Sequence, residues 1–434
     1  MTQHPRTTAS SSLPGLEAFD NASADARSTA YAMPLAAIDM SETDLYLNDT
    51  QAPYFKRLRD EAPVHYCPNG RFGAFWSITR YADIRAVEAN PAVFSSDALF
   101  GGITIRDQPP GFTTPMFIAM DPPGHAVQRG AVAPMFARKN LDLLEVRLRE
   151  CVTRILDALP IGETFDWVDQ VSREVAIQML AIMLDIPFAD RSKLSAWSDM
   201  AVAVDEQAGG PSPAERQAVL LQCLGYFTDL WKTRIALPPR HDLISMLAHN
   251  PATQGMSPMT YLGNLMLLIV GGNDTTRNSI TGGLLFLNDN PAQYRKLRHD
   301  PGLIGTMVPE IIRYQTPLAH MRRTARSDIM FGGEQIRKGD RVILWYVSGN
   351  RDERAIEQPD SFLIDRVKPN QHLAYGSGIH VCMGSRLAEM QLRILWEEIL
   401  ARWPLIEVVG APARVPSSFI RGYQSLPVRI PARS

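Results

Sequence analysis

The stretch AYGSGIHVCMG, residues 374–384, places three glycines, a histidine and one cysteine within eleven positions. Glycines usually mark turns, and a helical pattern starts directly after this stretch. A cysteine thiolate is a metal ligand, but a lone cysteine is more often a small buried hydrophobic residue. The loop by itself leaves both interpretations of Cys382 open.

A second unusual stretch, GGNDTT (271–276), interrupts an apolar helical pattern. Two adjacent glycines cost about 2 kcal/mol in a helix interior compared with alanines. One interpretation ends a helix at Gly271 and caps another with Asn273 or Asp274. In the other, a bulky flat ligand presses on a continuous helix, so that Asp274 and Thr275 place a carboxyl and a hydroxyl beside it. Such a pair is suited to relaying protons.

Two further spacings place charged residues on one helical face. In PEIIRYQTP (309–317), Glu310 and Arg313 are three apart and can pair. The same pattern recurs in EQIR (334–337), but there the context is a turn or strand, where such residues do not share a face. In MDPPGHAVQRG (120–130), His125 and Arg129 are four apart and can reach one anionic group. Taken alone, the spacing of Glu310 and Arg313 favours a solvated pair on a helix surface, and that of His125 and Arg129 is equally compatible with two unrelated surface residues.

The spacing of apolar residues and the turn residues along the chain predict the helices and strands that carry these motifs. Apolar residues spaced three and four apart predict helices over 141–159 and 173–186. A long helix opens at Ser257-Pro258 and can run to Asn290-Pro291. Aromatic-rich runs around Pro-Asn-Gly predict a β-hairpin over 64–79, and 341–350 reads as a strand ending in a turn. The sequence therefore predicts one large domain, mainly α with small antiparallel β-sheets.

The composition excludes several classes of protein. Lys and Arg total 44 against 46 Asp and Glu, and this balance favours neither nucleic acid nor an anionic membrane surface as a partner. Four widely separated cysteines form no CxxC pair, which argues against a disulfide framework or a zinc cluster. No stretch approaches the ~20 apolar residues of a membrane anchor. Residues 1–44 read as a flexible tail without a signal peptide, ahead of a domain over 45–434, and a cytoplasmic location is expected.

The order and spacing of the motifs resemble the cytochrome P-450 family over about residues 45 to 430. The resemblance rests on residues 374–384, called the cysteine loop below, on GGNDTT, EIIR and DPPGHAVQR, and on the segment NRDERAIEQPDSFLIDR (350–366). It implies the cytochrome P-450 fold and a heme b cofactor (iron protoporphyrin IX) whose iron is bound by the Cys382 thiolate. Gly376, Gly378 and Gly384 match the family's loop glycines, and Tyr375 stands where the family usually has phenylalanine.

The resemblance also implies roles for other residues. The residues expected to bind heme are His125, Arg129, Gly271, Arg323, Tyr375, Gly376 and His380. Within this set the two histidines and two arginines match the positions that bind the propionates. Arg323 is the match rather than Arg322, because it stands five residues before Asp328. Glu310 and Arg313 match a structural ion pair, and Asp274 and Thr275 match the acid–alcohol pair of the family.

LLIVGGNDTTRNSITGG and MGSRLAEMQLRILWEEIL are similar to the bacterial group that hydroxylates terminal carbons of alkanes and fatty acids. This resemblance implies a monooxygenase that inserts one atom of O2 into a C–H bond, with Ile103, Val270 and Leu318 lining the substrate pocket. A ferredoxin and a ferredoxin reductase are the expected electron donors. Three alternatives stay open: a different lipophilic substrate such as a terpenoid, a peroxide-driven hydroxylase, and a non-catalytic heme-thiolate sensor or carrier.

Overall fold

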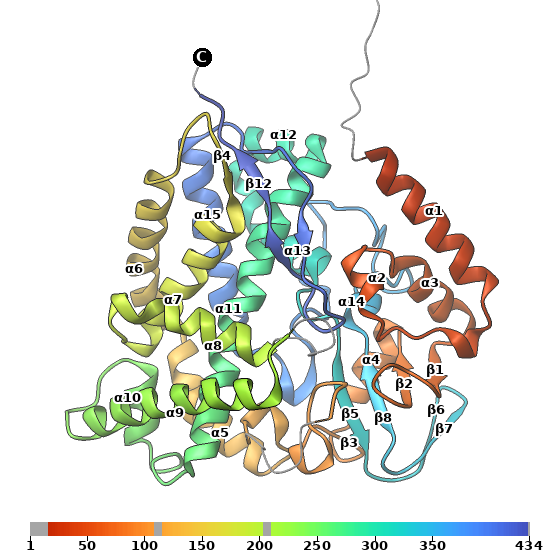
Figure 1. Cartoon of the computed structure of the whole chain (residues 1–434), viewed down its shortest axis with the longest axis horizontal. Helices are drawn as coiled ribbons and strands as arrows, with labels where there is room; N and C mark the ends of the chain where they lie inside the picture. The colour runs from red at the N-terminus through yellow and green to blue at the C-terminus, as the bar shows by residue number, and fades with distance from the viewer. Residues whose placement is uncertain (1–15, 108–114, 203–209, 433–434) are drawn as a thin grey trace, which may run out of the picture.

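A computed structural model of the chain describes residues 16–107, 115–202 and 210–432 (Figure 1). No helix in these ranges is long and apolar enough to cross a membrane. The α-helices are α1 (Leu16–Ala32), α2 (Thr43–Leu47), α3 (Ala52–Glu61), α4 (Tyr81–Glu88), α5 (Gly124–Val132), α6 (Arg138–Asp157), α7 (Glu174–Leu184), α8 (Arg191–Val202), α9 (Pro213–Ile235), α10 (Leu243–His249), α11 (Pro258–Asp289), α12 (Pro291–His299), α13 (Ile304–Gln315), α14 (Tyr346–Gly349) and α15 (Ser385–Arg402). The strands are β1 (Val64–Cys67), β2 (Phe75–Ile78), β3 (Phe94–Ser95), β4 (Thr164–Asp166), β5 (Met321–Ala325), β6 (Ile329–Phe331), β7 (Glu334–Ile336), β8 (Arg341–Leu344), β9 (Glu407–Val408), β10 (Ala413–Arg414), β11 (Tyr423–Ser425) and β12 (Pro427–Arg429).

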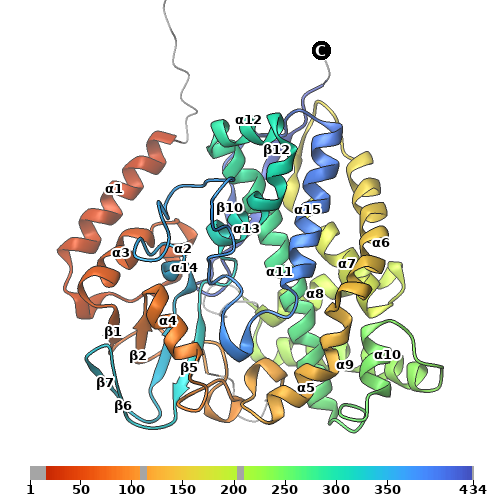
Figure 2. The same ribbon diagram turned by 180° about the vertical axis from the view of Figure 1, so that it is seen from behind.

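Helix α11 runs through the middle of the helical part of the molecule, between α15 on one side and α7 and α8 on the other (Figures 1 and 2). The Ser257 side chain accepts the backbone N–H of Thr260, and Pro258 occupies the first turn, as the sequence predicts. The helix continues for 32 residues without ending at Gly271, so the two-helix interpretation is wrong. Close packing accounts for one of its glycines, because a Cβ at Gly272 would lie 2.8 Å from a methyl carbon of Leu180 on α7.

A five-stranded sheet in the order β1-β2-β8-β5-β3 lies beside the helical part. The predicted hairpin is present as the antiparallel pair β1–β2, and β8 is the predicted strand that begins at residue 341. One pairing differs from the expected antiparallel pattern, because β2 and β8 run parallel. These two strands are far apart in the sequence, so no short turn fixes their relative direction.

The N-terminal segment differs from the predicted flexible tail. Helix α1 packs against α3, and Ala30, Ile38 and Met40 are buried in a cluster that also contains Phe55 and Trp345. The described residues between 16 and 44 are therefore folded onto the domain, and residues 1–15 lie outside the described ranges. The apolar residues of this segment follow no regular period, and their partners are distant in sequence. Periodicity alone does not detect such packing.

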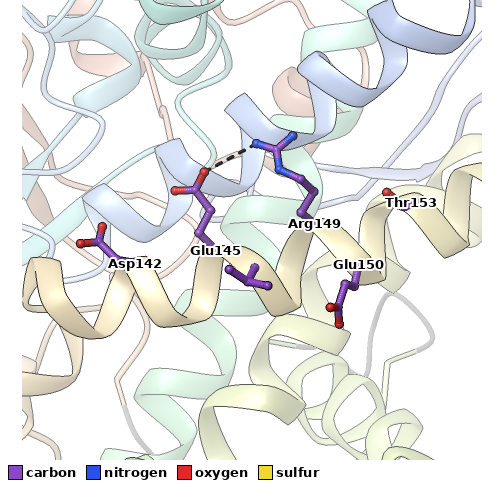
Figure 3. A pocket seen from close by; sticks show the side chains of 6 residues that line it. Asp142, Glu145, Arg149, Glu150 and Thr153 are labelled. Carbon is purple, nitrogen blue, oxygen red and sulfur yellow. Dashed lines mark ion pairs between the residues drawn. The ribbon is translucent and has the colours of Figure 1, made fainter.

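Helix α15 follows the cysteine loop directly and is held against α6 by charged side chains. The Arg149 guanidinium donates to Glu398 at 2.8 Å and to Glu397 at 2.6 Å. Arg149 also lines a shallow depression on α6, where it pairs with Glu145 (Figure 3). The other residues lining the depression are Asp142, Val146, Glu150 and Thr153. No residue of the cysteine loop contributes to it, so we do not assign it as the functional site.

Candidate functional site

The cysteine loop is a tight turn that requires its glycines. The backbone N–H of Cys382 donates to the Tyr375 carbonyl at 2.8 Å. Gly376 and Gly378 have φ values of 67° and 65°, a region that favours glycine. A Cβ at Gly378 would also lie 2.5 Å from the Glu88 carbonyl oxygen. The loop is thereby fixed between α4 and the start of α15.

Cys382 is the exposed member of the four cysteines, all of which lie in the described ranges; Cys67, Cys151 and Cys223 are buried. Its position deep in the fold raises the pKa of the thiol, while the backbone N–H groups of Gly384 and Ser385 and the Arg129 guanidinium oppose that rise. A sulfur that is deep in the protein yet not covered by protein atoms is placed to contact a bound group. The opposing N–H groups favour its thiolate form.

The middle of α11 faces space that the protein does not fill. Between residues 261 and 287, every position is buried except 267, 268, 270–272 and 275. A Cβ at Gly271 would meet no atom within 4 Å in the part of the chain that the structure describes, so close packing between those residues does not explain this glycine. The Thr275 hydroxyl lies on the same stretch and donates to the Gly271 carbonyl at 2.5 Å. These positions, 267, 268, 270–272 and 275, form the accessible stretch of α11. Their exposure fits a bulky group lying against the helix.

A cluster of basic side chains has buried nitrogen atoms without partners. The ring centroids of His125 and His380 are 4.4 Å apart, and Nε2 of His125 and both ring nitrogens of His380 have no hydrogen-bond partner among the described residues. Burial lowers the pKa of His380 to about 2, and the charges of Arg323, His125 and Arg129 add to that effect. A buried polar group without a partner costs about 1–3 kcal/mol. The cluster therefore fits an anionic group that would pair with these nitrogens.

The two arginines of this cluster are held by backbone and side-chain oxygens. Arg129 Nη2 donates to the Val381 carbonyl at 2.7 Å, next to the cysteine. Arg323 Nη1 donates to the Arg322 carbonyl at 2.8 Å, and its Nη2 lies 3.4 Å from Glu88 Oε1. Arg322 instead donates to Asp107 at 2.7 Å. The neighbouring arginines of β5 therefore have different partners, and Arg323 is the one beside His380.

The hydroxyl of Tyr375, which replaces the family's usual phenylalanine, donates to the Ser385 carbonyl at 3.2 Å. Burial raises the pKa of Tyr375 well above its usual value, and the nearby Glu389 carboxyl contributes to the rise. The phenol therefore stays protonated and joins the loop to the first turn of α15.

The structure separates the side chains of the predicted acid–alcohol pair. Asp274 is fully buried, accepts from Ser198 Oγ at 2.7 Å, and pairs with Arg277 Nη2 at 2.5 Å. Burial raises the pKa of Asp274 against the effect of Arg277. The Thr275 hydroxyl lies on the accessible stretch of α11, whereas the Asp274 carboxyl contacts α8. The sequence analysis identified neither partner: Ser198 lies 76 residues away and has no local signal, whereas Arg277 stands three residues after Asp274, a spacing that could have indicated the pair.

Glu310 and Arg313 form a fully buried, bidentate pair rather than the solvated pair that their spacing alone allows. Arg313 Nε and Nη2 donate to the two carboxylate oxygens at 2.7 and 2.8 Å. Arg366 Nε donates to the same carboxylate at 2.9 Å. Although burial opposes it, these arginines hold the pKa of Glu310 below its usual value. Arg366 has no local sequence signal, because it lies 56 residues from its partner.

The predicted pocket residues are all half-buried. Ile103 and Leu318 pack against the same hydrophobic cluster, as does Phe419, and Leu318 forms a β-bridge with Ile420. Val270 lies on the accessible stretch of α11 and packs against a second cluster. All three predicted pocket residues are therefore apolar side chains that the described residues cover only in part.

The sequence is similar to those of known proteins. A sequence model of the family Cytochrome P450 matches residues 303–412. Linalool 8-monooxygenase of Pseudomonas putida is 36% identical over 399 residues, which cover 90% of this chain and 98% of that protein. The chain is a cytochrome P450. The P450 is also 31% identical to the methyl-branched lipid omega-hydroxylase of Mycobacterium tuberculosis, over 91% of this chain and 95% of that protein.

Solved structures agree with this membership. Cytochrome P450-153 from Novosphingobium aromaticivorans is 43% identical, with a TM-score of 0.84 over 90% of this chain and 99% of that one. CYP153D17 from Sphingomonas sp. PAMC 26605 is 44% identical, with a TM-score of 0.86 over 91% and 99%. The predicted fold class is thereby confirmed.

Family membership makes this protein a heme-thiolate monooxygenase with heme b as its cofactor. The residues fit that group: Cys382 is an uncovered cysteine, Gly271 leaves room on α11, and the imidazoles of His125 and His380 have buried nitrogens suited to carboxylates. When bound, the heme supplies the chemistry that activates O2, and a cysteine thiolate ligand favours cleavage of the O–O bond.

Proposed function

We propose that this cytochrome P450 hydroxylates the terminal carbon of a linear hydrophobic substrate, an alkane or a fatty acid. The observation that carries the proposal is the accessible stretch of α11, whose half-buried side chains include Leu267, Leu268 and Val270 and whose accessible positions carry no charged residue. The names of relatives support attack near a chain end. One is an omega-hydroxylase of methyl-branched lipids, and another is a steroid C26-monooxygenase.

In this proposal Cys382 would hold the heme iron, and His125, Arg129, Arg323 and His380 would hold the propionates. The Thr275 hydroxyl would pass protons into the site. Asp274 would supply them after its carboxyl leaves Arg277, and its raised pKa favours a protonated form. A ferredoxin and a ferredoxin reductase would deliver the electrons.

Burial of the chain explains affinity but not the position of attack. Each buried methylene contributes about 0.8 kcal/mol, so an eight-carbon chain would gain roughly 6 kcal/mol. Every methylene gains the same amount from burial. A C–H bond of the terminal methyl is harder to break than a C–H bond of the neighbouring methylene. A product ratio of about 99 to 1 for the terminus requires about 2.7 kcal/mol between the two barriers. We assign this difference to a narrow approach to the reacting position, formed by Leu318 and Val270.

Leu318→Ala tests the narrow approach. We expect subterminal alcohols to rise from a minor to a substantial share of the products, because the shortened side chain lets the penultimate carbon reach the reacting position. Gas chromatography of the products from a linear alkane measures the ratio. Leu143→Ala, at an exposed leucine of α6, is the control and should keep the wild-type ratio. An unchanged ratio in Leu318→Ala would remove Leu318 from the constriction.

Thr275→Ala tests the hydroxyl on α11. We expect substrate binding to stay nearly unchanged, while the product formed per NADH falls roughly tenfold and hydrogen peroxide takes its place, since proton transfer by a positioned group is worth at least that much. Parallel assays of NADH, product and peroxide measure the coupling. Thr276→Ala removes a neighbouring buried hydroxyl and should couple like the wild type. Wild-type coupling in Thr275→Ala would exclude this threonine from proton delivery.

A terpenoid is the second candidate substrate, favoured by the similarity to linalool 8-monooxygenase. Titrating the ferric protein with alkanes, fatty acids and terpenes, and following the change of spin state, separates the two classes. We expect linear chains to give the larger shift at lower concentration. A saturating shift with terpenes and none with linear chains would replace the proposed substrate class. Activity with peroxide and none with a ferredoxin would select the peroxide-driven alternative, and binding without any turnover would select a sensor or carrier.

A further inference from the structure

Glu88, the last residue of α4, is a carboxylate in the protein interior beside the cysteine loop. It is 4% exposed. Ser377 Oγ, in the loop, donates to Glu88 Oε2 at 2.7 Å. The Tyr346 hydroxyl, at the start of α14, donates to Oε1, and Arg323 of β5 lies 3.4 Å from the same oxygen. One carboxylate therefore receives donors from three separate parts of the chain.

The backbone of the same residue supports the loop. A Cβ at Gly378 would lie 2.5 Å from the Glu88 carbonyl oxygen, and a Cβ at Gly376 would lie 3.3 Å from Glu88 Oε1. The loop thus approaches the end of α4 as closely as glycine allows. Figure 2 shows α4 next to β5 and α14, the elements that supply the other partners.

Burying a carboxylate costs several kcal/mol unless partners compensate for it. Hydrogen bonds to a charged acceptor are the strong ones. Here two of the three compensating partners are Ser377, five residues before Cys382, and Arg323, which lies beside His380; the third is Tyr346. The partners of the carboxylate are thus concentrated around the site that fits the heme.

We propose that Glu88 is a positioning residue of the heme site, which holds the cysteine loop through Ser377 and orients the Arg323 guanidinium toward a propionate. The second part of this proposal, the orientation of Arg323, rests on the proposed function, in which Arg323 binds a heme propionate. A purely structural role would stabilise the fold without affecting the heme, so the two roles differ in measurable ways.

The test compares the holoenzymes of Glu88→Gln, Ser377→Ala, Arg323→Leu and Glu353→Gln with the wild type. Glu353 is the matched control, because its carboxylate also forms ion pairs but does so at the surface, with Lys56 and Arg354. Three quantities are measured: the rate of heme transfer to excess apomyoglobin, the ferric/ferrous reduction potential, and the midpoint of thermal unfolding.

In Glu88→Gln we expect heme loss about tenfold faster than in the wild type, equivalent to about 1.4 kcal/mol. The reduction potential should become more positive, because a negative charge that favours the ferric state is removed. The unfolding midpoint of the holoenzyme should change little, because in the proposed site a propionate still pairs with the Arg323 guanidinium and the glutamine can still accept a hydrogen bond. Ser377→Ala should raise heme loss by a smaller factor, and Glu353→Gln should match the wild type in all three measurements.

Wild-type heme loss in Glu88→Gln would overturn the proposal, and so would a lowered unfolding midpoint together with an unchanged potential. If Glu88→Gln does not fold, Ser377→Ala decides, and wild-type heme loss in that variant would reject the positioning role. Wild-type heme loss in Arg323→Leu would instead refute the assignment of Arg323 and the second part of the proposal. The contact through Ser377 would still be tested by the other variants.

Discussion

Cys382→Ser is expected to abolish the red-shifted Soret band of the reduced carbon monoxide complex. That band reports a thiolate bound to the iron, and a serine hydroxyl does not provide the same electron donation. Much of the fold should survive, because the cysteine side chain is exposed and serine preserves its size. Difference spectroscopy on the purified variant, together with far-UV circular dichroism, measures both effects.

Cys151→Ser is the matched control for this experiment. Cys151 is buried on α6 and its sulfur accepts from Arg154 Nη2 at 3.2 Å, away from the cysteine loop. We expect this variant to keep the band. A normal band in Cys382→Ser would refute the assignment of Cys382 as the iron ligand.

Arg313→Ala is expected to lower the free energy of unfolding by a large amount. Removing one partner of a buried ion pair costs about 3–5 kcal/mol, because the other charge is left buried without compensation. Here Glu310 would keep Arg366 but lose both donors of Arg313, and the Asn350 and Pro359 carbonyls would each lose a hydrogen bond. Since domains are stable by about 5–15 kcal/mol, we expect poor recovery of folded protein and a much lower urea midpoint.

Arg149→Ala controls for the loss of an arginine in an ion-pair network. Its side chain is 37% exposed while it pairs with Glu397 and Glu398. Exposed pairs are worth about 0–1 kcal/mol, so its urea midpoint should fall only slightly. Equal midpoints for Arg313→Ala and Arg149→Ala would show that the buried pair is not a structural centre of the fold.

The sequence predicts correctly those helices and strands whose ends are determined by residues adjacent in the chain. The cap at Ser257-Pro258 and the break at Asn290-Pro291 place the ends of α11 correctly. Pro-Asn-Gly places the β1–β2 hairpin. In both cases the deciding residues are neighbours in sequence, so a short window contains the whole signal.

Features that depend on distant partners were not predictable in this way. The orientation of the Asp274 carboxyl is set by Ser198 on α8. Glu88 looks like an ordinary polar residue at a helix end until the fold brings Ser377 and Tyr346 against it. Similarly, Ile38 and Met40 become core residues because the fold brings them into one cluster with Phe55 and Trp345. Such contacts need the tertiary structure, because no periodicity connects the partners.

The proposed chain-end specificity is tested most directly by the products of the wild-type enzyme. Purified protein, supplied with a ferredoxin, a ferredoxin reductase and NADH, is incubated with a linear alkane and with a fatty acid of similar length. We predict that 1-alcohols and ω-hydroxy acids predominate. A predominance of 2-alcohols would contradict terminal hydroxylation, although it would leave the heme-thiolate monooxygenase itself intact.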